Sequence, residues 1–103
     1  MISDPVSWTP QFISTEVEKA VAIIAAQPHV RRIWFFGSVA KQRGNTGSDL
    51  DFAVEGLDRS RHFQVLGELM LELRSPVDLV RWEDANSILR AEIIRQGTVV
   101  YAA

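Results

Sequence analysis

A loop between two apolar runs constrains the fold of this chain more than any other feature. The first run, residues 33–36, ends at Gly37 and Ser38, and the second begins around Asp49 and Asp51. Short apolar runs bounded by Gly, Asn and Ser residues are typical of buried strands. The sequence therefore predicts two strands, over residues 30–36 and 49–55, joined by a short helix and a polar loop.

Asp49 and Asp51 are two residues apart at the start of the second predicted strand. Strand side chains alternate between the two faces of a sheet, so both carboxylates point the same way, about 6.5–7 Å apart along the chain. Two carboxylates on one face of an apolar strand repel each other unless a cation lies between them. Mg²⁺ prefers such hard oxygen ligands. The pair therefore predicts a divalent-metal site.

Gly37 and Ser38 are suited to holding a phosphate. Glycine lets a ligand approach the backbone closely, because it has no Cβ, and the Ser38 hydroxyl lies beside the free N–H groups that begin the predicted helix. Two metal ions roughly 3.5–4 Å apart can clamp the reacting oxygens of an in-line displacement at phosphorus. The structural alternatives are a plain helix cap at Ser38 and turn residues at the two aspartates.

The other predicted elements alternate between helix and strand, which indicates an α/β layer fold. Residues 1–13 have no period and predict an irregular arm, and Thr15 with Glu18 resembles the capping box of a helix that ends before Pro28. A strand is predicted over residues 76–81. Asp84 or Asn86 is expected to cap a last helix that Gly97 ends, before a short strand or extended tail.

The helix predicted over residues 60–73 carries many apolar side chains. Their spacing predicts one buried face, lined by Phe63, Leu66, Met70 and Leu73. Val65 and Leu69 widen this face. Gly67 weakens this helix and allows close packing. Trp82 follows the third strand and is expected to pack, and both histidines are expected at the surface.

Composition limits the class of protein. The 103 residues predict one domain, over residues 14–103, and 47% hydrophobic content provides for a core. Net charge is −2, which offers no basic surface for stable nucleic-acid binding. The chain has no cysteine, no signal-peptide pattern at its start and no apolar run of membrane-spanning length. These features predict a cytoplasmic protein without a membrane partner.

Gly37-Ser38, ten spacer residues and Asp49-x-Asp51 together resemble the signature of the DNA polymerase β-like nucleotidyltransferase superfamily. That family uses a third carboxylate on a later strand, and Asp78 in the predicted strand 76–81 fits this position. The ending, residues 93–101, looks like that of the minimal nucleotidyltransferases, or MNT domains, many of which are antitoxins paired with a HEPN-type toxin. The resemblance spans about residues 17–101 and implies a small mixed sheet backed by helices.

The resemblance also implies an activity and its residues. It implies transfer of a nucleoside monophosphate, AMP from ATP or its equivalent from another nucleoside triphosphate, to a hydroxyl on a protein partner. Asp49 and Asp51 would bind two Mg²⁺ ions, Asp78 would bind the catalytic one and help to deprotonate the acceptor, and Gly37 and Ser38 would hold phosphates. Many MNT domains have an arginine where this chain has Val39. The candidates for that phosphate-binding charge are Lys41 and Arg43.

Two functions remain open from the sequence. In the first, the chain is an enzyme that modifies a HEPN-type toxin. In the second, it is a non-catalytic antitoxin that neutralises its partner by covering it. A homodimer is compatible with either one.

Overall fold

The computed structural model describes residues 9–40 and 48–103, which contain a four-stranded mixed sheet of order β3-β2-β1-β4. β1 pairs antiparallel with β2 and β4, and β2 pairs parallel with β3. The strands are β1 (Arg32–Phe36), β2 (Leu50–Glu55), β3 (Val77–Arg81) and β4 (Thr98–Ala102). The α/β class and the mixed sheet predicted from the sequence are confirmed. Lys41 and Arg43 lie outside the described residues.

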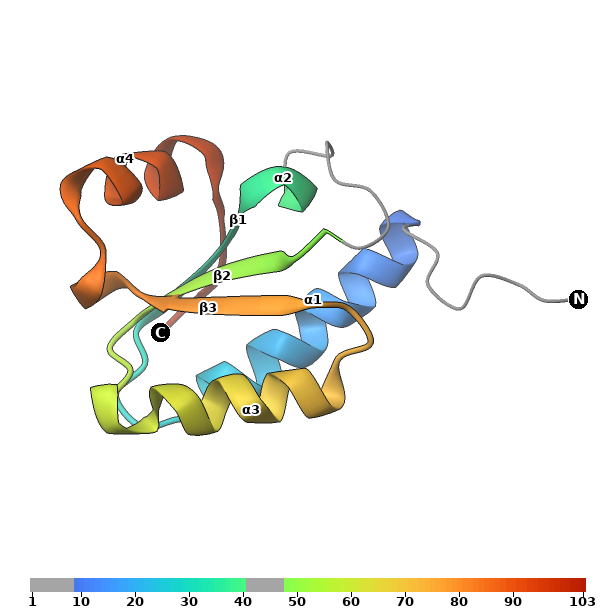
Figure 1. Ribbon diagram of the computed structural model, residues 1–103, viewed down its shortest axis with the longest axis horizontal. Helices are drawn as coiled ribbons and strands as arrows, with labels where there is room; N and C mark the ends of the chain where they lie inside the picture. The colour runs from blue at the N-terminus through green and yellow to red at the C-terminus, as the bar shows by residue number, and fades with distance from the viewer. Residues whose placement is uncertain (1–8, 41–47) are drawn as a thin grey trace, which may run out of the picture.

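Helices cover both faces of the sheet (Figure 1). α1 (Pro10–Ala25) and α3 (His62–Glu72) lie on one face, and α4 (Ser87–Gln96) lies on the other. The short helix α2 (Gly37–Ala40) continues directly from β1 and contacts α4. Two 3₁₀ turns, Arg59–Arg61 and Trp82–Asp84, precede α3 and α4. No helix in residues 9–40 and 48–103 combines the length and the apolar character needed to cross a membrane.

The first helix begins earlier than the sequence predicts. Thr9 is its N-cap, and the Thr9 hydroxyl accepts a hydrogen bond from the Phe12 backbone N–H at 3.0 Å. Pro10 occupies the first helical turn, where its missing N–H and fixed φ are tolerated. The predicted capping box is therefore wrong: Thr15 lies inside the helix and donates its hydroxyl to the Gln11 carbonyl. Residues 10–13, assigned to the irregular arm, are helical.

The core has one cluster on each side of the sheet. The larger cluster fills the space between the sheet and the helices α1 and α3, and Phe35 stacks on Phe52 at its centre. The smaller cluster lies on the α4 side, where Trp34 stacks on Trp82 with ring centroids 4.7 Å apart. The expectation that Trp82 packs is therefore confirmed.

The buried face of α3 differs from the predicted one. Val65, Leu69 and Leu73 are buried, whereas the side chains of Phe63 and Met70 are 84% and 63% exposed. A helix that carries apolar residues around most of its circumference has several stripes at helical spacing, and packing against α1 and the sheet selects among them. Phe63 and Met70 lie on a stripe that nothing in the described part of the chain covers.

The last helix agrees with its predicted boundaries. Asn86 is the N-cap, and its side-chain oxygen accepts a hydrogen bond from the Leu89 N–H at 2.8 Å. Gly97 is the C-cap, as expected. The residues after it form a genuine strand, β4, paired with β1, so the extended-tail alternative is wrong.

Candidate active site

Asp51 and Asp78 are register partners on the parallel strands β2 and β3. On its other side, Asp51 pairs with Phe36 of β1, whose side chain belongs to the cluster under α4. Partners in register point to the same face of a sheet. Both carboxylates therefore face the α4 side, where Asp51 is half-buried and Asp78 is exposed.

Asp49 lies immediately before β2, which begins at Leu50 rather than at Asp49 as predicted. The Leu50 N–H donates to the Pro76 carbonyl at 2.8 Å, which aligns the first residues of the two parallel strands. Asp49 is exposed, and its negative charge acts on Asp51. The fold thus brings together all three carboxylates that the sequence singles out.

The described surroundings of Asp51 disfavour its charged form. Partial burial, followed by the charges of Asp78, Asp49 and Glu92, raises the pKa of Asp51 from 3.8 to about 6. Glu92 is a fourth acid that the sequence did not indicate. It comes from α4, and only the packing of that helix against the sheet brings it within electrostatic reach of Asp51.

Gly37 lies directly against the Asp51 carboxylate. Its φ is +90°, a conformation that L-residues with side chains rarely adopt. A Cβ at this position would collide with Asp51 Oδ2 and would lie only 3.1 Å from Asp51 Cγ. Glycine is therefore required for the backbone at the end of β1 to pass so close to the proposed metal ligand.

The residues after Gly37 point in different directions. Ser38 is exposed, so its hydroxyl is accessible to a ligand. Val39 is buried in the core cluster on the α1 side. A valine at this position therefore contributes to packing between the sheet and α1.

Comparison with known proteins identifies the family. The profile described as "Polymerase beta, Nucleotidyltransferase" matches residues 18–103. The chain belongs to the polymerase β nucleotidyltransferase family. It is also 32% identical over 73 residues to the protein adenylyltransferase MntA of Shewanella oneidensis, a match that covers 68% of this chain and 52% of that relative. The matched region thus spans about half the length of the relative.

Two solved structures have the same fold as this member of the family. A toxin–antitoxin crystal structure with AMP-PNP matches with a TM-score of 0.72 and 26% identity, over 86% of this chain and 73% of the other. A complex of a tri-AMPylated HEPN toxin of Shewanella oneidensis with an MNT antitoxin matches with a TM-score of 0.70 and 24% identity, over 87% and 72%. At 24% identity, the match to the HEPN–MNT complex shows a shared fold only.

The three aspartates of this nucleotidyltransferase domain have the oxygen donors that a divalent metal prefers, but the structure does not arrange them as a complete metal site. Asp49, Asp51 and Asp78 supply hard oxygen donors, and partial burial followed by the charges of the neighbouring acids raises the pKa of Asp51. Within residues 9–40 and 48–103, however, no group of three or more His, Asp or Glu side chains is positioned to hold an ion.

A hollow of about 820 Å³ lies on the surface of the protein, and none of the three candidate aspartates lines it. Its walls come from α1, α2, β1 and β4, and most of its lining is apolar, including Val17, Phe35 and Val100. The hollow is therefore not formed by the residues proposed for the phosphate chemistry.

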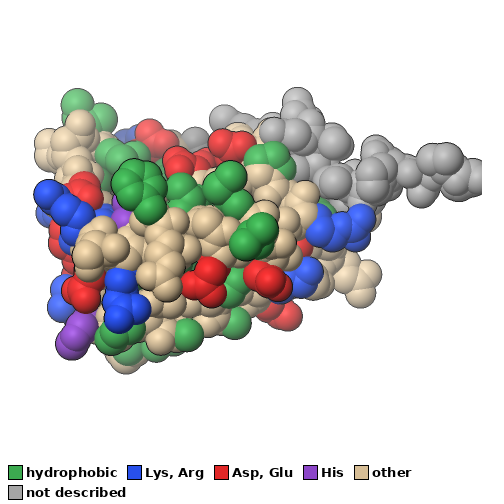
Figure 2. Space-filling view, turned by 60° about the horizontal axis from the view of Figure 1, so that its bottom comes forward, with side chains coloured by type: hydrophobic (Ala, Val, Ile, Leu, Met, Phe, Trp, Pro, Cys, Tyr) green, Lys and Arg blue, Asp and Glu red, His purple; other side chains and the backbone are tan. Residues whose placement is uncertain are grey.

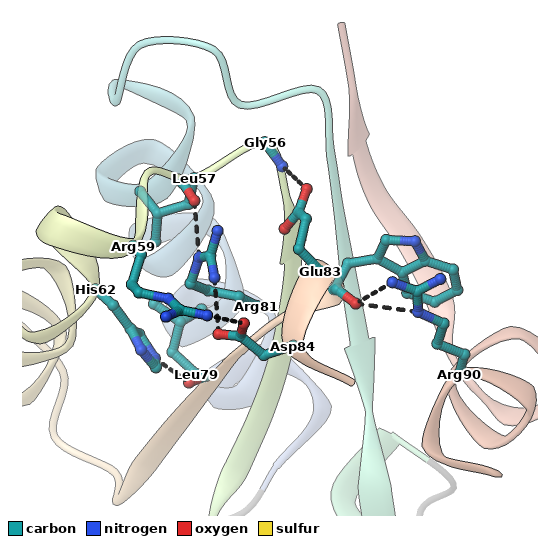
Figure 3. Close-up of polar contacts among 10 residues, drawn as sticks. Gly56, Leu57, Arg59, His62, Leu79, Arg81, Glu83, Asp84 and Arg90 are labelled. Carbon is teal, nitrogen blue, oxygen red and sulfur yellow. Dashed lines mark hydrogen bonds and ion pairs between the residues drawn. The ribbon is translucent and has the colours of Figure 1, made fainter. Parts of the chain in front are cut away.

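A polar network holds the far end of β3 (Figure 3). Arg81 donates to the Leu57 carbonyl at 2.9 Å and to the Asp84 carboxylate at 2.8 Å, and Arg59 donates to the other oxygen of Asp84 at 3.2 Å. The hydrogen bond from Arg81, with that from Arg59, holds the pKa of Asp84 below its usual value. The network joins β3 to the turn after β2, which fixes the strand that carries Asp78.

Two further contacts position α4 and α3 around β3 (Figure 3). Arg90 of α4 donates twice to the Trp82 carbonyl, at 2.9 and 3.1 Å, and its guanidinium lies 4.7 Å from the centre of the Trp82 ring. His62 Nε2 lies 2.6 Å from the Leu79 carbonyl oxygen. His62 is therefore a half-buried link from α3 to β3, and its prediction as a surface residue is wrong, whereas His29 is exposed.

The buried carboxylate of Glu16 anchors the start of β3. Glu16 is 1% exposed, and its Oε1 accepts hydrogen bonds from the Arg74 N–H at 2.8 Å, the Ser75 N–H at 2.9 Å and the Ser75 hydroxyl at 2.9 Å. Lys19 Nζ lies 3.6 Å from the other oxygen. These contacts hold α1 to the segment that leads into Asp78. Nothing in the sequence pattern distinguished Glu16 from an exposed helical glutamate.

Proposed function

We propose that the chain transfers a nucleoside monophosphate, AMP from ATP, to a hydroxyl of a protein partner, and that the partner is a HEPN-type toxin. The observation that carries the proposal is the pairing of Asp51 with Asp78 on neighbouring strands, with Asp49 and Gly37 beside them. The similarity to a protein adenylyltransferase and to a toxin–antitoxin structure with AMP-PNP supports it.

Asp49, Asp51 and Asp78 would hold the Mg²⁺ ions, which when bound supply charge stabilisation to the phosphate oxygens. Gly37 lets the Asp51 carboxylate lie against the backbone, and the backbone of Gly37 and the Ser38 hydroxyl would hold a phosphate there. The acceptor oxygen forms a bond to the α-phosphorus, the bond from that phosphorus to the bridging oxygen breaks, and pyrophosphate leaves. Asp78 takes up the acceptor proton. The protein's contribution is mainly positioning and charge.

A second function has an observation in its favour. Because no three acidic or histidine side chains among the described residues are arranged to hold an ion, a non-catalytic antitoxin that covers its partner remains the rival. Such a protein would need the fold and its docking surface but not the three carboxylates.

Co-expression with the protein encoded beside this one, followed by intact mass spectrometry of both chains, separates the two functions. A mass increase of one or more nucleotidyl units on the partner, lost in Asp78→Asn, is the expected result. Purified chains with ATP and either Mg²⁺ or a chelator should repeat the difference in vitro. A stable complex in which neither chain is modified would instead identify the covering module.

Replacing Ser38 by alanine is expected to weaken triphosphate binding more than it destabilises the fold. A lost hydrogen bond to a charged phosphate costs about 1.5–3 kcal/mol. An exposed side chain away from core contacts changes the free energy of unfolding by only about 0.5 kcal/mol. Calorimetry with Mg²⁺–ATP and denaturant unfolding compare the two losses. A larger loss of stability than of affinity would make Ser38 a structural residue only.

A further inference from the structure

A hollow of about 310 Å³ lies on the α4 side of the sheet, between the C-terminal end of α4 and the edge strand β4. Its apolar wall comes from Trp34 and Trp82, which stack on each other in the smaller core cluster, and from Ile94 and Val99. Ile94 and Val99 are 64% and 50% exposed, so they present apolar surface to solvent at the rim. We call this surface, with the Arg32 side chain that also lines it, the α4–β4 hollow. Its volume is at the lower end of the range for ligand pockets, about 300–1,000 Å³, which suits one large side chain better than a whole cofactor.

Both faces of the two tryptophan rings in the hollow are occupied. Trp34 and Trp82 stack with ring centroids 4.7 Å apart, which takes one face of each ring. The Arg90 guanidinium lies over Trp82 at 4.7 Å from the ring centre, and that of Arg32 lies over Trp34 at 5.6 Å. Binding of single-stranded nucleic acid relies on aromatic faces on which the bases stack. The hollow therefore suits an apolar side chain of a protein, packed against the ring edges and the aliphatic rim, rather than a nucleobase.

Arg32 adds a positive charge at the rim of the hollow. It is exposed, and its register partner on β2 is Glu55. The Glu55 carboxylate, however, lies 3.3 Å from Nη2 of Arg31, and no carboxylate in residues 9–40 and 48–103 forms an ion pair with Arg32 or Arg90. A guanidinium can bind a carboxylate through two parallel hydrogen bonds. The charge thus favours a partner in which an acidic residue lies next to the apolar side chain.

The exposed apolar residues of α3 lack this combination of features. Phe63, Met70 and Leu71 line neither of the two hollows, although their side chains are exposed. Figure 2, which brings the α3 side forward, shows acidic side chains beside the hydrophobic ones there. An acidic partner segment is therefore better matched to the surroundings of Arg32 than to the α3 side of the molecule.

We propose that the α4–β4 hollow is the docking site of the protein that accepts the nucleotide, and that this partner inserts a large apolar side chain whose neighbouring carboxylate binds Arg32. The identity of the partner rests on the proposed function, but docking itself needs no transfer. Tryptophan and arginine are enriched at the positions where interfaces gain most of their binding energy. Arg32 begins β1 and Phe36, the register partner of Asp51, ends it, so Arg32 and Asp51 are roughly 13 Å apart along the sheet. A folded partner can span this distance and bring a hydroxyl to the carboxylates while it stays docked.

Calorimetric titration with the protein encoded beside this chain, in a chelator that prevents transfer, tests the docking site. Ile94→Gln removes apolar surface from the rim and Arg32→Glu reverses the charge, and each should weaken the complex about tenfold or more. Added salt should weaken the wild-type complex, and the complex of Arg32→Glu should depend less on salt. Neither variant should change the affinity for Mg²⁺–ATP, because neither residue belongs to the candidate active site.

Leu71→Gln is the matched control, since Leu71 is 85% exposed on α3 and its replacement should leave the complex unchanged. All three variants should stay folded by circular dichroism, because the replaced side chains are exposed. The proposal is overturned if no complex forms, if Ile94→Gln or Arg32→Glu binds like the wild type, or if Leu71→Gln weakens binding equally. Occupation of the hollow by single-stranded RNA or by a second copy of the chain, in place of the partner, would also overturn it. A complex that depends on Ile94 and Arg32 but leaves both chains unmodified with Mg²⁺ and ATP would contradict the proposed transfer and not the docking site.

Discussion

Replacing Asp51 by asparagine is expected to reduce nucleotidyl transfer by at least about 100-fold and to stabilise the metal-free protein. Asp51 is the central member of the carboxylate cluster, paired with Asp78 and in contact with the Gly37 backbone. Asparagine keeps the shape of the side chain but loses the charge that a metal ion requires. It also removes a charge whose partial burial, together with repulsion from the neighbouring acids, raises the pKa of Asp51.

The stability effect depends on pH in a defined direction. Because the pKa of Asp51 rises from 3.8 to about 6 on folding, the folded state binds the proton more tightly between these values. The free energy of unfolding of the wild type therefore falls as pH rises from about 4 to about 6. An asparagine at position 51 does not titrate, so the variant does not lose stability over this pH range. At pH 7 we therefore expect its free energy of unfolding to exceed that of the wild type by about 1–2 kcal/mol. This is less than the pKa shift alone would give, because solvent screens the partly exposed charge.

Denaturant unfolding at pH 4, 5, 6 and 7 in a chelator measures this difference, and Mg²⁺ should stabilise the wild type but not the variant. Asp58→Asn is the matched control, because Asp58 is exposed and makes no side-chain cap hydrogen bond. It should change neither activity nor stability. Near wild-type transfer by Asp51→Asn at saturating Mg²⁺ would contradict the assignment of the site.

Replacing Glu16 by alanine is expected to lower the free energy of unfolding by about 3–5 kcal/mol. The change leaves two backbone N–H groups and the Ser75 hydroxyl without their acceptor in a buried position. Glu16→Gln keeps an acceptor oxygen and loses only the charge, so about 1–2 kcal/mol is expected for it. Denaturant unfolding of both variants gives the two values.

Glu18→Ala on the same helix is the control, since Glu18 is exposed and should change the free energy of unfolding by less than about 0.5 kcal/mol. A loss below about 1 kcal/mol in Glu16→Ala would mean that the buried hydrogen bonds of Glu16 are replaced without cost. Because Ser75 leads into β3, we also expect Glu16→Ala to impair transfer in the fraction that remains folded.

The sequence singled out the catalytic candidates from signals that are local in the chain. The spacing of Gly37-Ser38 and Asp49-x-Asp51 spans one loop, and the apolar residues around Asp78 mark its strand. The fold places Asp51 in register with Asp78 and against Gly37, with Asp49 in electrostatic reach, and the metal-binding and catalytic roles of these residues stay predictions. Lys41 and Arg43 fall outside the described residues, so their phosphate-binding role stays a prediction.

The sequence predicted burial poorly where one helix offered several apolar stripes. In α3, Phe63 and Met70 of the predicted face are exposed, whereas Leu73 of that face and the flanking Val65 and Leu69 are buried. Helical spacing shows which side chains share a side of the helix but not which side another element covers. The start of α1 was missed because residues 1–13 show no apolar period, although a proline such as Pro10 is tolerated in the first turn of a helix.

The sequence by itself determined the order of helices and strands, and it singled out Asp49, Asp51 and Asp78 as candidates, because these signals depend on residues close together in the chain. Only the tertiary structure decided that Glu16 would be a buried anchor, that Glu92 would reach Asp51 and that Phe63 and Met70 would stay exposed. These features depend on contacts between residues up to 59 positions apart, and the identity of each residue carries no signal of its distant partner.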